Sequence, residues 1–401
     1  MKINIVIADG LTGRAARLYG APLAHHLARR GCEVRLILLH RRWDETEAKR
    51  FEAEPGVTIV YVQQAFERLS GRSLLRRGVT VTRAMLRAIL EYETDVNVIC
   101  EMHPTVVAAA RIARFLRGTP MVLAAEQLLS ESANCRAKKT CGFFERVGAR
   151  LSAAIAANNR QLADRLSEMS RGRNRAVFVP PAIEPSLYRT GGLGAEALRE
   201  LLEIEDRPVA ACVGETGEPE ARALMDIFAA VVRRIPAAIL LLADGGESGL
   251  RAEYARRIGV ADNVRFARPI SAANFGRYIS LADVVVDPTG DAAGRVLPGM
   301  FFGRPVLAAG GSDIAWLLGE GGITVRPDAT SDFEQALYLM LVDRRLRLKM
   351  GRRGAQRVRR HFLWENLAER WVDLISGVAA GSSAAVKREA ERVRREEGVL
   401  S

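Results

Sequence analysis

The chain has 401 residues, 48% of them hydrophobic, which is enough for two domains of ordinary size. No apolar run approaches the roughly 20 residues of a membrane span, and the start, MKINIVIADG, lacks the apolar region and cleavage site of a signal peptide. The cysteines are scattered, without zinc or redox spacing, so we expect reduced thiols in a cytoplasmic protein.

The net charge of +12 favours anionic partners, namely phosphorylated substrates, a membrane surface or nucleic acid. Arginine-rich usage in a GC-rich genome explains the same charge equally well. Aromatic residues are only 6% of the chain, which argues against a surface that stacks single-stranded nucleic acid.

The first half alternates apolar β-branched runs with helical patterns, which predicts a doubly wound parallel sheet. We expect strands at residues 3–8, 34–39, 57–62, 95–100, 120–126, 151–158 and 176–183. Helices are expected at 14–30, 69–90, 105–116 and within 158–169, whereas 130–146 has the composition of a basic loop.

Polar and glycine residues follow several of these strands. Gly10, Gly13 and Arg14 form a glycine loop after the first strand, although the third glycine of a dinucleotide fingerprint is missing. Glu101 and His103 follow the strand at 95–100; His103 either contacts a substrate or packs before Pro104. Glu126, after the strand at 120–126, acts as an acid, base or acceptor ligand, or is simply a hydrogen-bonded carboxylate.

The helical stretch near residues 68–90 is basic and amphipathic, with arginines interleaved among leucines and valines. One interpretation is docking to an anionic membrane, and the other is an ordinary solvated helix face.

A second doubly wound pattern begins after a proline-rich break, so we place the linker at residues 181–190. Strands are expected at 208–214, 238–245, 264–267, 284–286, 305–308 and 323–327. Helices are expected at 219–234, 250–258, 272–280, 297–302, 332–342, 345–361 and 364–375, followed by a charged tail.

Residues 282–313 combine two buried strands with glycine loops and a short helix, which predicts a ligand site at the strand ends. Backbone N–H groups at a helix start suit a phosphate. Arg295 either binds that phosphate or is a surface arginine, and Asp313 is expected to cap the next helix.

Several motifs occur in a specific order: LAHHLARRGCEVRLI, VPPAIEPSLY, ADVVVDPT and GRVLPGMFFGRPVLAAGGSDIAWLL. Together they resemble the GT-B-fold retaining glycosyltransferases that use nucleotide-sugar donors. The resemblance implies an α/β fold of two Rossmann-like domains facing a cleft. It further implies an acceptor-side domain at 1–182, a nucleotide-sugar domain at 183–361, a helix at 362–376 that crosses back, and a tail at 377–401.

The resemblance also indicates which positions should bind the donor, and the residues there depart from the family pattern. Glu215 and Glu220 stand where the family has an arginine and a lysine. Of the paired glutamates, the first position is Asp291 and the second is Gly299. Glu126 stands at the position of a sugar-binding histidine.

The part of the family site that this sequence retains consists of backbone groups. These belong to Gly10, Gly13, Gly214 and Gly294 and include the N–H groups of Arg295, Val296 and Leu297.

The implied function is transfer of a sugar from a nucleotide-sugar to a saccharide or lipid-linked acceptor in polysaccharide assembly, with no metal or other cofactor. The alternative is a non-catalytic relative that acts as a binding or partner subunit, because Glu215, Glu220 and Gly299 replace expected donor-binding residues. A nucleic-acid-binding protein is the weakest hypothesis, since no recognised module is present. We therefore expect a cytoplasmic protein, associated with membrane if residues 68–90 dock there, and no nucleic-acid partner.

Overall fold

The computed structural model describes residues 1–7, 19–39, 55–62, 74–131, 137–172, 176–188, 194–214, 216–243, 248–267, 272–290 and 292–381. The chain forms two compact units. Unit 1 contains Met1–Pro181 together with the chain from Trp364 onward, and unit 2 contains Ala182–Leu363. Each unit is built on one parallel sheet, which confirms the predicted fold class.

Unit 1 has a seven-stranded sheet in the order β3-β2-β1-β4-β5-β6-β7. Its strands are β1 (Lys2–Ile7), β2 (Glu33–Leu38), β3 (Val57–Tyr61), β4 (Val96–Ile99), β5 (Met121–Ala125), β6 (Ala154–Ala157) and β7 (Val177–Phe178). All neighbouring pairs are parallel; Ile5, for example, pairs with Leu36 on one side and Val98 on the other. The central strands are largely apolar because helices cover both faces, and the buried Asn4 of β1 donates to Asn97 Oδ1 of β4 at 3.0 Å.

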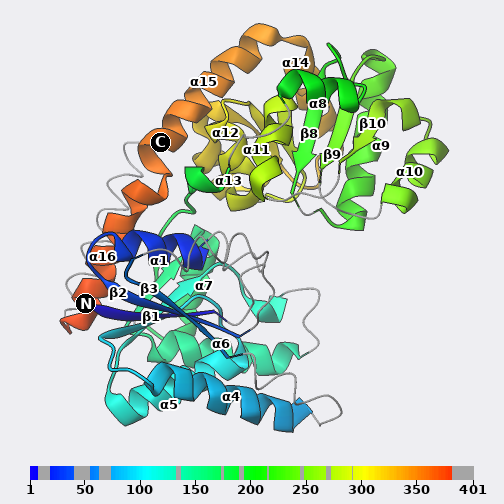
Figure 1. The fold of residues 1–401 in the computed structure, drawn as a ribbon. Helices are drawn as coiled ribbons and strands as arrows, with labels where there is room; N and C mark the ends of the chain where they lie inside the picture. Colours follow the sequence, from blue (N-terminus) through cyan, green and yellow to red (C-terminus); the bar gives the residue numbers. More distant parts are fainter. Residues whose placement is uncertain are drawn as a thin grey trace. The chain divides into compact units, whose positions relative to one another are not determined.

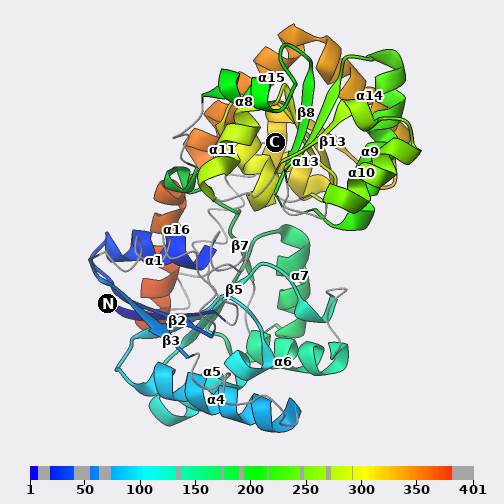
Figure 2. The same ribbon diagram turned by 45° about the vertical axis from the view of Figure 1, so that its right-hand side comes forward.

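Helices pack on both faces of this sheet (Figures 1 and 2). They are α1 (Ala21–Ala28), α4 (Leu74–Leu90), α5 (Pro104–Arg117), α6 (Lys138–Leu151), α7 (Arg160–Met169) and α16 (Trp364–Ala379), with a 3₁₀ turn, η2 (Leu129–Glu131). Helices α4, α5 and α6 cover one face, and α1 and α16 the other.

Helix α16 belongs to unit 1 although it follows unit 2 in sequence. Its Trp364 and Trp371 are 1% exposed, and both rings meet Tyr19 edge to face at centroid distances of 5.3 and 5.6 Å. His26 of α1 stacks on Trp364. These large aromatic contacts hold the C-terminal helix against the first sheet.

Unit 2 has a six-stranded parallel sheet in the order β10-β9-β8-β11-β12-β13. The strands are β8 (Val209–Val213), β9 (Ile239–Ala243), β10 (Val264–Phe266), β11 (Val284–Asp287), β12 (Val306–Ala309) and β13 (Gly322–Val325). Strands β8, β9, β11 and β12 are entirely buried, as continuous apolar runs in a parallel sheet should be.

Two hydrophobic clusters flank the second sheet, one on each face. One includes residues of α8 (Ala195–Leu201), α11 (Ala272–Leu281), α12 (Leu297–Phe301), α13 (Ser312–Leu318) and α15 (Arg344–His361). The other includes residues of α9 (Glu218–Arg234), α10 (Ser248–Arg257) and α14 (Thr330–Val342). Short turns complete the unit: η3 (Pro185–Leu187), η4 (Ala261–Asn263), the π-helical η5 (Ala292–Val296) and η6 (Gly319–Gly321).

The structure corrects three local expectations. Residues 138–146 are not a loop but most of α6, and helix α8 was not predicted. The buried face of α6 consists of Cys141, Glu145, Gly148 and Ala149, so its 3.6-residue period carries little hydrophobic signal. Asp313 does not cap α13, because the N-cap residue is Gly311 and Asp313 lies in the first turn.

Candidate functional site

Each sheet has one point at which the strand order reverses. In unit 1 it lies between β1 and β4, and in unit 2 between β8 and β11. Ligands of open parallel sheets bind beyond the C-terminal ends of the strands at such a point. The residues that follow these four strands are therefore the candidates for binding and chemistry.

The switch point of unit 2 carries a polar cluster formed by Thr216, Asp287, Thr289 and Arg295, called here the switch-point cluster, in which Asp287 and Arg295 are buried and Thr289 is exposed. The guanidinium of Arg295 donates from one nitrogen to Asp287 Oδ1 at 2.9 Å and to Thr289 Oγ1 at 2.8 Å. Its other terminal nitrogen donates to Thr216 Oγ1 at 3.0 Å. Asp287 is 0% and Arg295 2% exposed, so this ion pair is fully desolvated.

Arg295 thereby connects the loop after β8 to the loop after β11. The interpretation of Arg295 as a surface arginine is wrong, because its side chain is buried and bonded to both loops. Thr289 adds to the network by donating its backbone N–H and its hydroxyl to Asp287. Gly214 lies beside the cluster with a φ of +108°, which favours glycine.

The N-terminus of α9 follows directly after this loop. The carboxylate of Glu220 folds back over Gly217, the N-cap residue, and occupies the space that a Cβ there would take. Anions are favoured at a helix N-terminus, and here the protein places its own anion there. Glu220 therefore stands close to the position at which a bound phosphate would meet this helix.

Two arginines accompany these acidic residues. Glu218 Oε1 accepts from Arg222 at 2.8 Å, and Glu218 Oε2 accepts from the buried Arg251 at 2.9 Å. Partial burial acts to raise the pKa of Glu218, but the hydrogen bonds from Arg251 and Arg222 prevail, so that the pKa is lowered. Arg251 also donates to the carbonyl of Thr216, which fixes the loop after β8 from a second side.

The helix after β11 places its predicted site residues in the core. Val296 and Leu297 are 0% exposed. A Cβ at Gly299 would lie 2.9 Å from Val306 and 3.2 Å from Val285, so a side chain at this position points into the sheet. A side chain at position 299 would therefore meet the core, which corrects the expectation that this position binds the donor. Gly294 is partly exposed in the π-helical turn η5.

Five of the predicted site residues lie outside the described residues: Gly10, Gly13, Arg14, Glu215 and Asp291. The other predicted residues of unit 1 lie at the ends of β4 and β5. His103 is the N-cap of α5, and its Nδ1 lies 2.7 Å from the hydroxyl of Thr105. The partly exposed ring thus caps α5, and its contact with a substrate stays a prediction. The partly exposed Glu101 lies two residues before His103.

Glu126 and Glu101 lie near the buried thiol of Cys100. Burial raises the pKa of Cys100, and the negative charges of Glu126 and Glu101 raise it further. Burial likewise raises the pKa of Tyr19, with a contribution from Glu126, whereas Arg370 of α16 opposes the shift. Glu126 thus contributes to the raised pKa of both buried groups.

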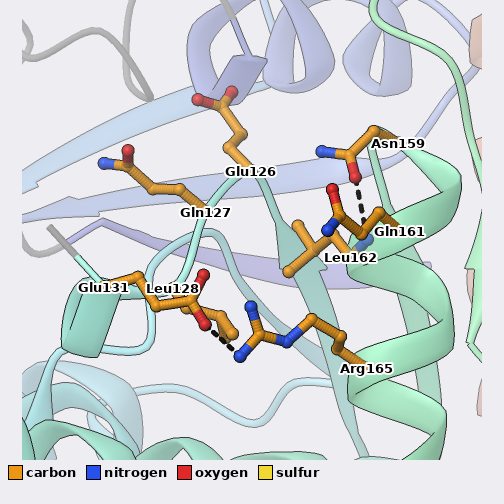
Figure 3. A pocket seen from close by; sticks show the side chains of 8 residues that line it. All are labelled: Glu126, Gln127, Leu128, Glu131, Asn159, Gln161, Leu162 and Arg165. Carbon is orange, nitrogen blue, oxygen red and sulfur yellow. Dashed lines mark hydrogen bonds and ion pairs between the residues drawn. The ribbon is translucent and has the colours of Figure 1, made fainter. Parts of the chain in front are cut away.

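A pocket of about 270 Å³ opens beside Glu126 (Figure 3). Its lining comes from the segment after β5, from η2 and from the start of α7: Glu126, Gln127, Leu128, Glu131, Asn159, Gln161, Leu162 and Arg165. Figure 3 shows an ion pair between Glu131 and Arg165 at one end. The Asn159 side chain accepts from the N–H of Leu162 and so caps α7.

Among the described residues, no group of three or more His, Cys, Asp or Glu side chains could hold a metal ion. None of the helices in that part of the chain is long and apolar enough to cross a membrane.

Sequence reasoning missed Thr216, Asp287 and Arg251 as members of the site. The motif ADVVVDPT contained the one available signal, a carboxylate that ends a fully apolar strand.

Comparisons with known proteins agree with this architecture. Residues 14–182 match the family model described as "Glycosyl transferase 4-like domain", and residues 207–343 match the model "Glycosyl transferases group 1".

The chain is also similar to named glycosyltransferases and to a solved structure. A D-inositol 3-phosphate glycosyltransferase from Nocardia farcinica is 31% identical over 54% of this chain, which spans about half of that protein's length (50%). The Actinosynnema mirum protein of the same name is 28% identical, with 88% of this chain and 89% of that protein aligned. The crystal structure of HepE from Anabaena in complex with UDP-glucose superposes with a TM-score of 0.73 and 16% identity, over 94% of this chain and all of that one.

The two matched models lie in order along the chain, one on each parallel sheet. This arrangement is that of a two-domain Rossmann-like enzyme fold. The chain belongs to the GT-B-fold glycosyltransferase family.

Proposed function

We propose that this protein transfers a sugar, with retention, from a nucleotide-sugar donor to a saccharide or lipid-linked acceptor. In this proposal unit 2 binds the donor and unit 1 the acceptor. The observation that carries it is the switch-point cluster, in which Arg295 fixes the loops after β8 and β11 where a parallel sheet binds its ligand.

The donor's leaving group is a nucleoside diphosphate, so the site must stabilise developing negative charge. Arg222, Arg251 and Arg295 are the cations nearest the loop after β8 that the described residues provide for this role. Each is paired with Glu218 or Asp287, and because Arg222 and Arg251 share Glu218, the three arginines and two carboxylates leave one positive charge for the donor. Backbone N–H groups at the start of α9 complete the set.

The acceptor is proposed to be a polyol bound in the pocket of Figure 3. Carboxylate and amide side chains of Glu126, Gln127, Asn159 and Gln161 accept from and donate to hydroxyl groups. Glu126 is the residue proposed to act on an acceptor hydroxyl, since it is a carboxylate at the rim of this pocket. The names of the inositol phosphate transferases among the relatives support a polyol as the acceptor class.

A non-catalytic binding subunit is the second candidate, and Glu220 favours it. Its carboxylate covers Gly217 at the start of α9, where it would repel a donor phosphate. Catalysis therefore requires Glu220 to swing away when the donor binds, whereas a binding subunit needs no such movement.

Calorimetric titration with a panel of nucleotides and nucleotide-sugars, followed by an assay for sugar transfer, separates the two candidates. Glu220→Gln should tighten nucleoside diphosphate binding about fivefold, because it removes a like charge from the helix N-terminus. Glu196→Gln, which changes an exposed first-turn glutamate of α8, is the matched control and should change nothing.

The double substitution Glu215→Arg plus Glu220→Lys should tighten binding further. If no nucleotide or nucleotide-sugar binds, the catalytic proposal fails. Binding without transfer favours the binding subunit.

We also propose peripheral contact with an anionic membrane. Of residues 68–90, to which the sequence assigns this contact, helix α4 is described, and its arginines Arg83 and Arg87 are exposed. Such contact would bring a lipid-linked acceptor to unit 1.

A further inference from the structure

We infer that helices α4, α5 and α6 together form a surface on which unit 1 lies flat against an anionic lipid bilayer. This surface, called here the basic helical face, extends the proposed membrane contact beyond α4. The three helices contain eleven arginine and lysine residues and a single carboxylate, Glu145. Glu145 is 0% exposed and accepts hydrogen bonds from the backbone and hydroxyl of Ser130. The three helices thus present no exposed acidic side chain of their own.

The same face exposes large apolar side chains. Phe115 is 88% and Leu116 59% exposed at the end of α5, and Ile112 precedes them by one helical turn. Phe143 of α6 and Val79 of α4 are 53% and 61% exposed. Scattered apolar residues are normal on a surface, but a cluster with basic neighbours is the composition of an interfacial helix.

The three helices are adjacent on one side of the seven-stranded sheet (Figures 1 and 2). Arg83 and Arg87 of α4 are exposed one turn apart, and Arg111 is exposed on α5. In the described chain exposed carboxylates flank these helices: Glu131 precedes α6, and Glu91, just past the end of α4, pairs with Arg35 at 2.9 Å. Glu93 follows it, so acidic residues bound the face rather than interrupt it.

A bilayer fits this composition better than nucleic acid does. Each arginine near an anionic leaflet adds to the attraction, and Phe115 and Leu116 can enter the interface between headgroups and acyl chains. Single-stranded nucleic acid would require successive aromatic rings along a groove, whereas Phe115 and Phe143 stand on separate helices.

The face also adjoins the pocket of Figure 3. Ser130 of η2 binds Glu145 of α6, and Glu131 of the same turn lines the pocket. A lipid-linked acceptor held in the bilayer would therefore have its headgroup near that rim. Only this placement of the acceptor headgroup rests on the proposed function, because binding of the protein to a membrane can be measured without sugar transfer.

Co-sedimentation with large unilamellar vesicles tests the inference on the full chain. We expect binding to vesicles with 30 mol% phosphatidylglycerol and at least tenfold weaker binding to pure phosphatidylcholine. The triple variant Arg83→Gln, Arg87→Gln and Arg111→Gln should bind anionic vesicles about 100-fold more weakly, since each arginine near the surface contributes roughly fivefold. Phe115→Ser should cost about tenfold, through lost apolar burial.

The matched control removes the same charge from exposed arginines of unit 2. Arg233→Gln, Arg256→Gln and Arg326→Gln together should leave binding within about fivefold of the unmodified chain. If both triple variants lose binding equally, or if the protein binds no anionic vesicles, the inference is overturned. Binding to an RNA oligonucleotide but not to vesicles would overturn it as well.

Insertion is tested separately from charge. Phe115→Trp should be quenched by brominated phospholipids, whereas Leu201→Trp, at a 68% exposed position on α8, should not be. Equal quenching at both positions, or none at Phe115→Trp, would contradict the proposed orientation.

Discussion

Removing Arg295 should destabilise unit 2 more than removal of any surface arginine. Arg295→Met deletes one charge-assisted bond to Asp287 and two bonds to threonine hydroxyls. At about 2 kcal/mol for the first and about 1 kcal/mol for each of the others, the loss is about 4 kcal/mol. This agrees with the roughly 3–5 kcal/mol expected when one partner of a buried pair is removed.

Hydrogen exchange of peptides from β8 and β11 provides the assay, because it reports opening of unit 2 separately from unit 1. Arg353→Met is the matched control: its pair with Glu320 spans 3.0 Å but the side chains are 57% and 68% exposed, so its loss should cost about 1 kcal/mol or less. The double variant Arg295→Met plus Asp287→Leu should recover much of the stability, since no uncompensated charge remains buried. Equal effects of Arg295→Met and Arg353→Met would refute this account of the cluster.

Two further predictions concern the neighbouring helices. Gly299→Ala should lower the free energy of unfolding by about 1–3 kcal/mol in urea denaturation, because the new methyl group meets Val306. Gly249→Ala, at a helical position of α10 with open space around it, should not lower it, and equal effects of the two substitutions on the unfolding midpoint would contradict the packing described. The lowered pKa of Glu218 means that its pairing stabilises the fold above the ordinary value of 4.5 and that this contribution is lost as the pH falls below it. The stability difference between the unmodified chain and Glu218→Gln should therefore shrink on acidification, and a difference that does not vary with pH would show that the arginines do not hold the carboxylate.

The switch-point cluster gives the departures from the family pattern a physical context. The reversed charge of Glu220 lies at the start of α9, and the three arginines of this region carry one positive charge more than their partners Glu218 and Asp287. The electrostatics of the loop after β8 are thus set by paired side chains rather than by an isolated cation. The nucleotide titrations measure nucleoside diphosphate affinity, and the comparison with Glu220→Gln tests whether a bound diphosphate must displace Glu220.

The class of fold and the positions of nearly all strands were predictable from local sequence patterns. Buried parallel strands must be continuous apolar runs, so VAACV at β8 and VVVD at β11 are visible without any tertiary information. Glycines at strand ends likewise marked the loops of unit 2. The extent of helix α6 was not predicted, because its buried face is made of small and polar residues. One of these is Glu145, whose hydrogen-bond partner Ser130 lies 15 residues away.

Which side chains meet depends on how the sheet brings distant loops together. Arg295 contacts Thr216 across 79 residues of sequence, a pairing that no local pattern encodes. The direction in which a side chain at position 299 points could not be predicted either. A shift of one residue along a helix rotates the side chain by about 100°, which can turn it from the solvent into the core. Periodicity and composition act over a few residues, whereas the site is assembled from loops that the sheet brings together at its switch point.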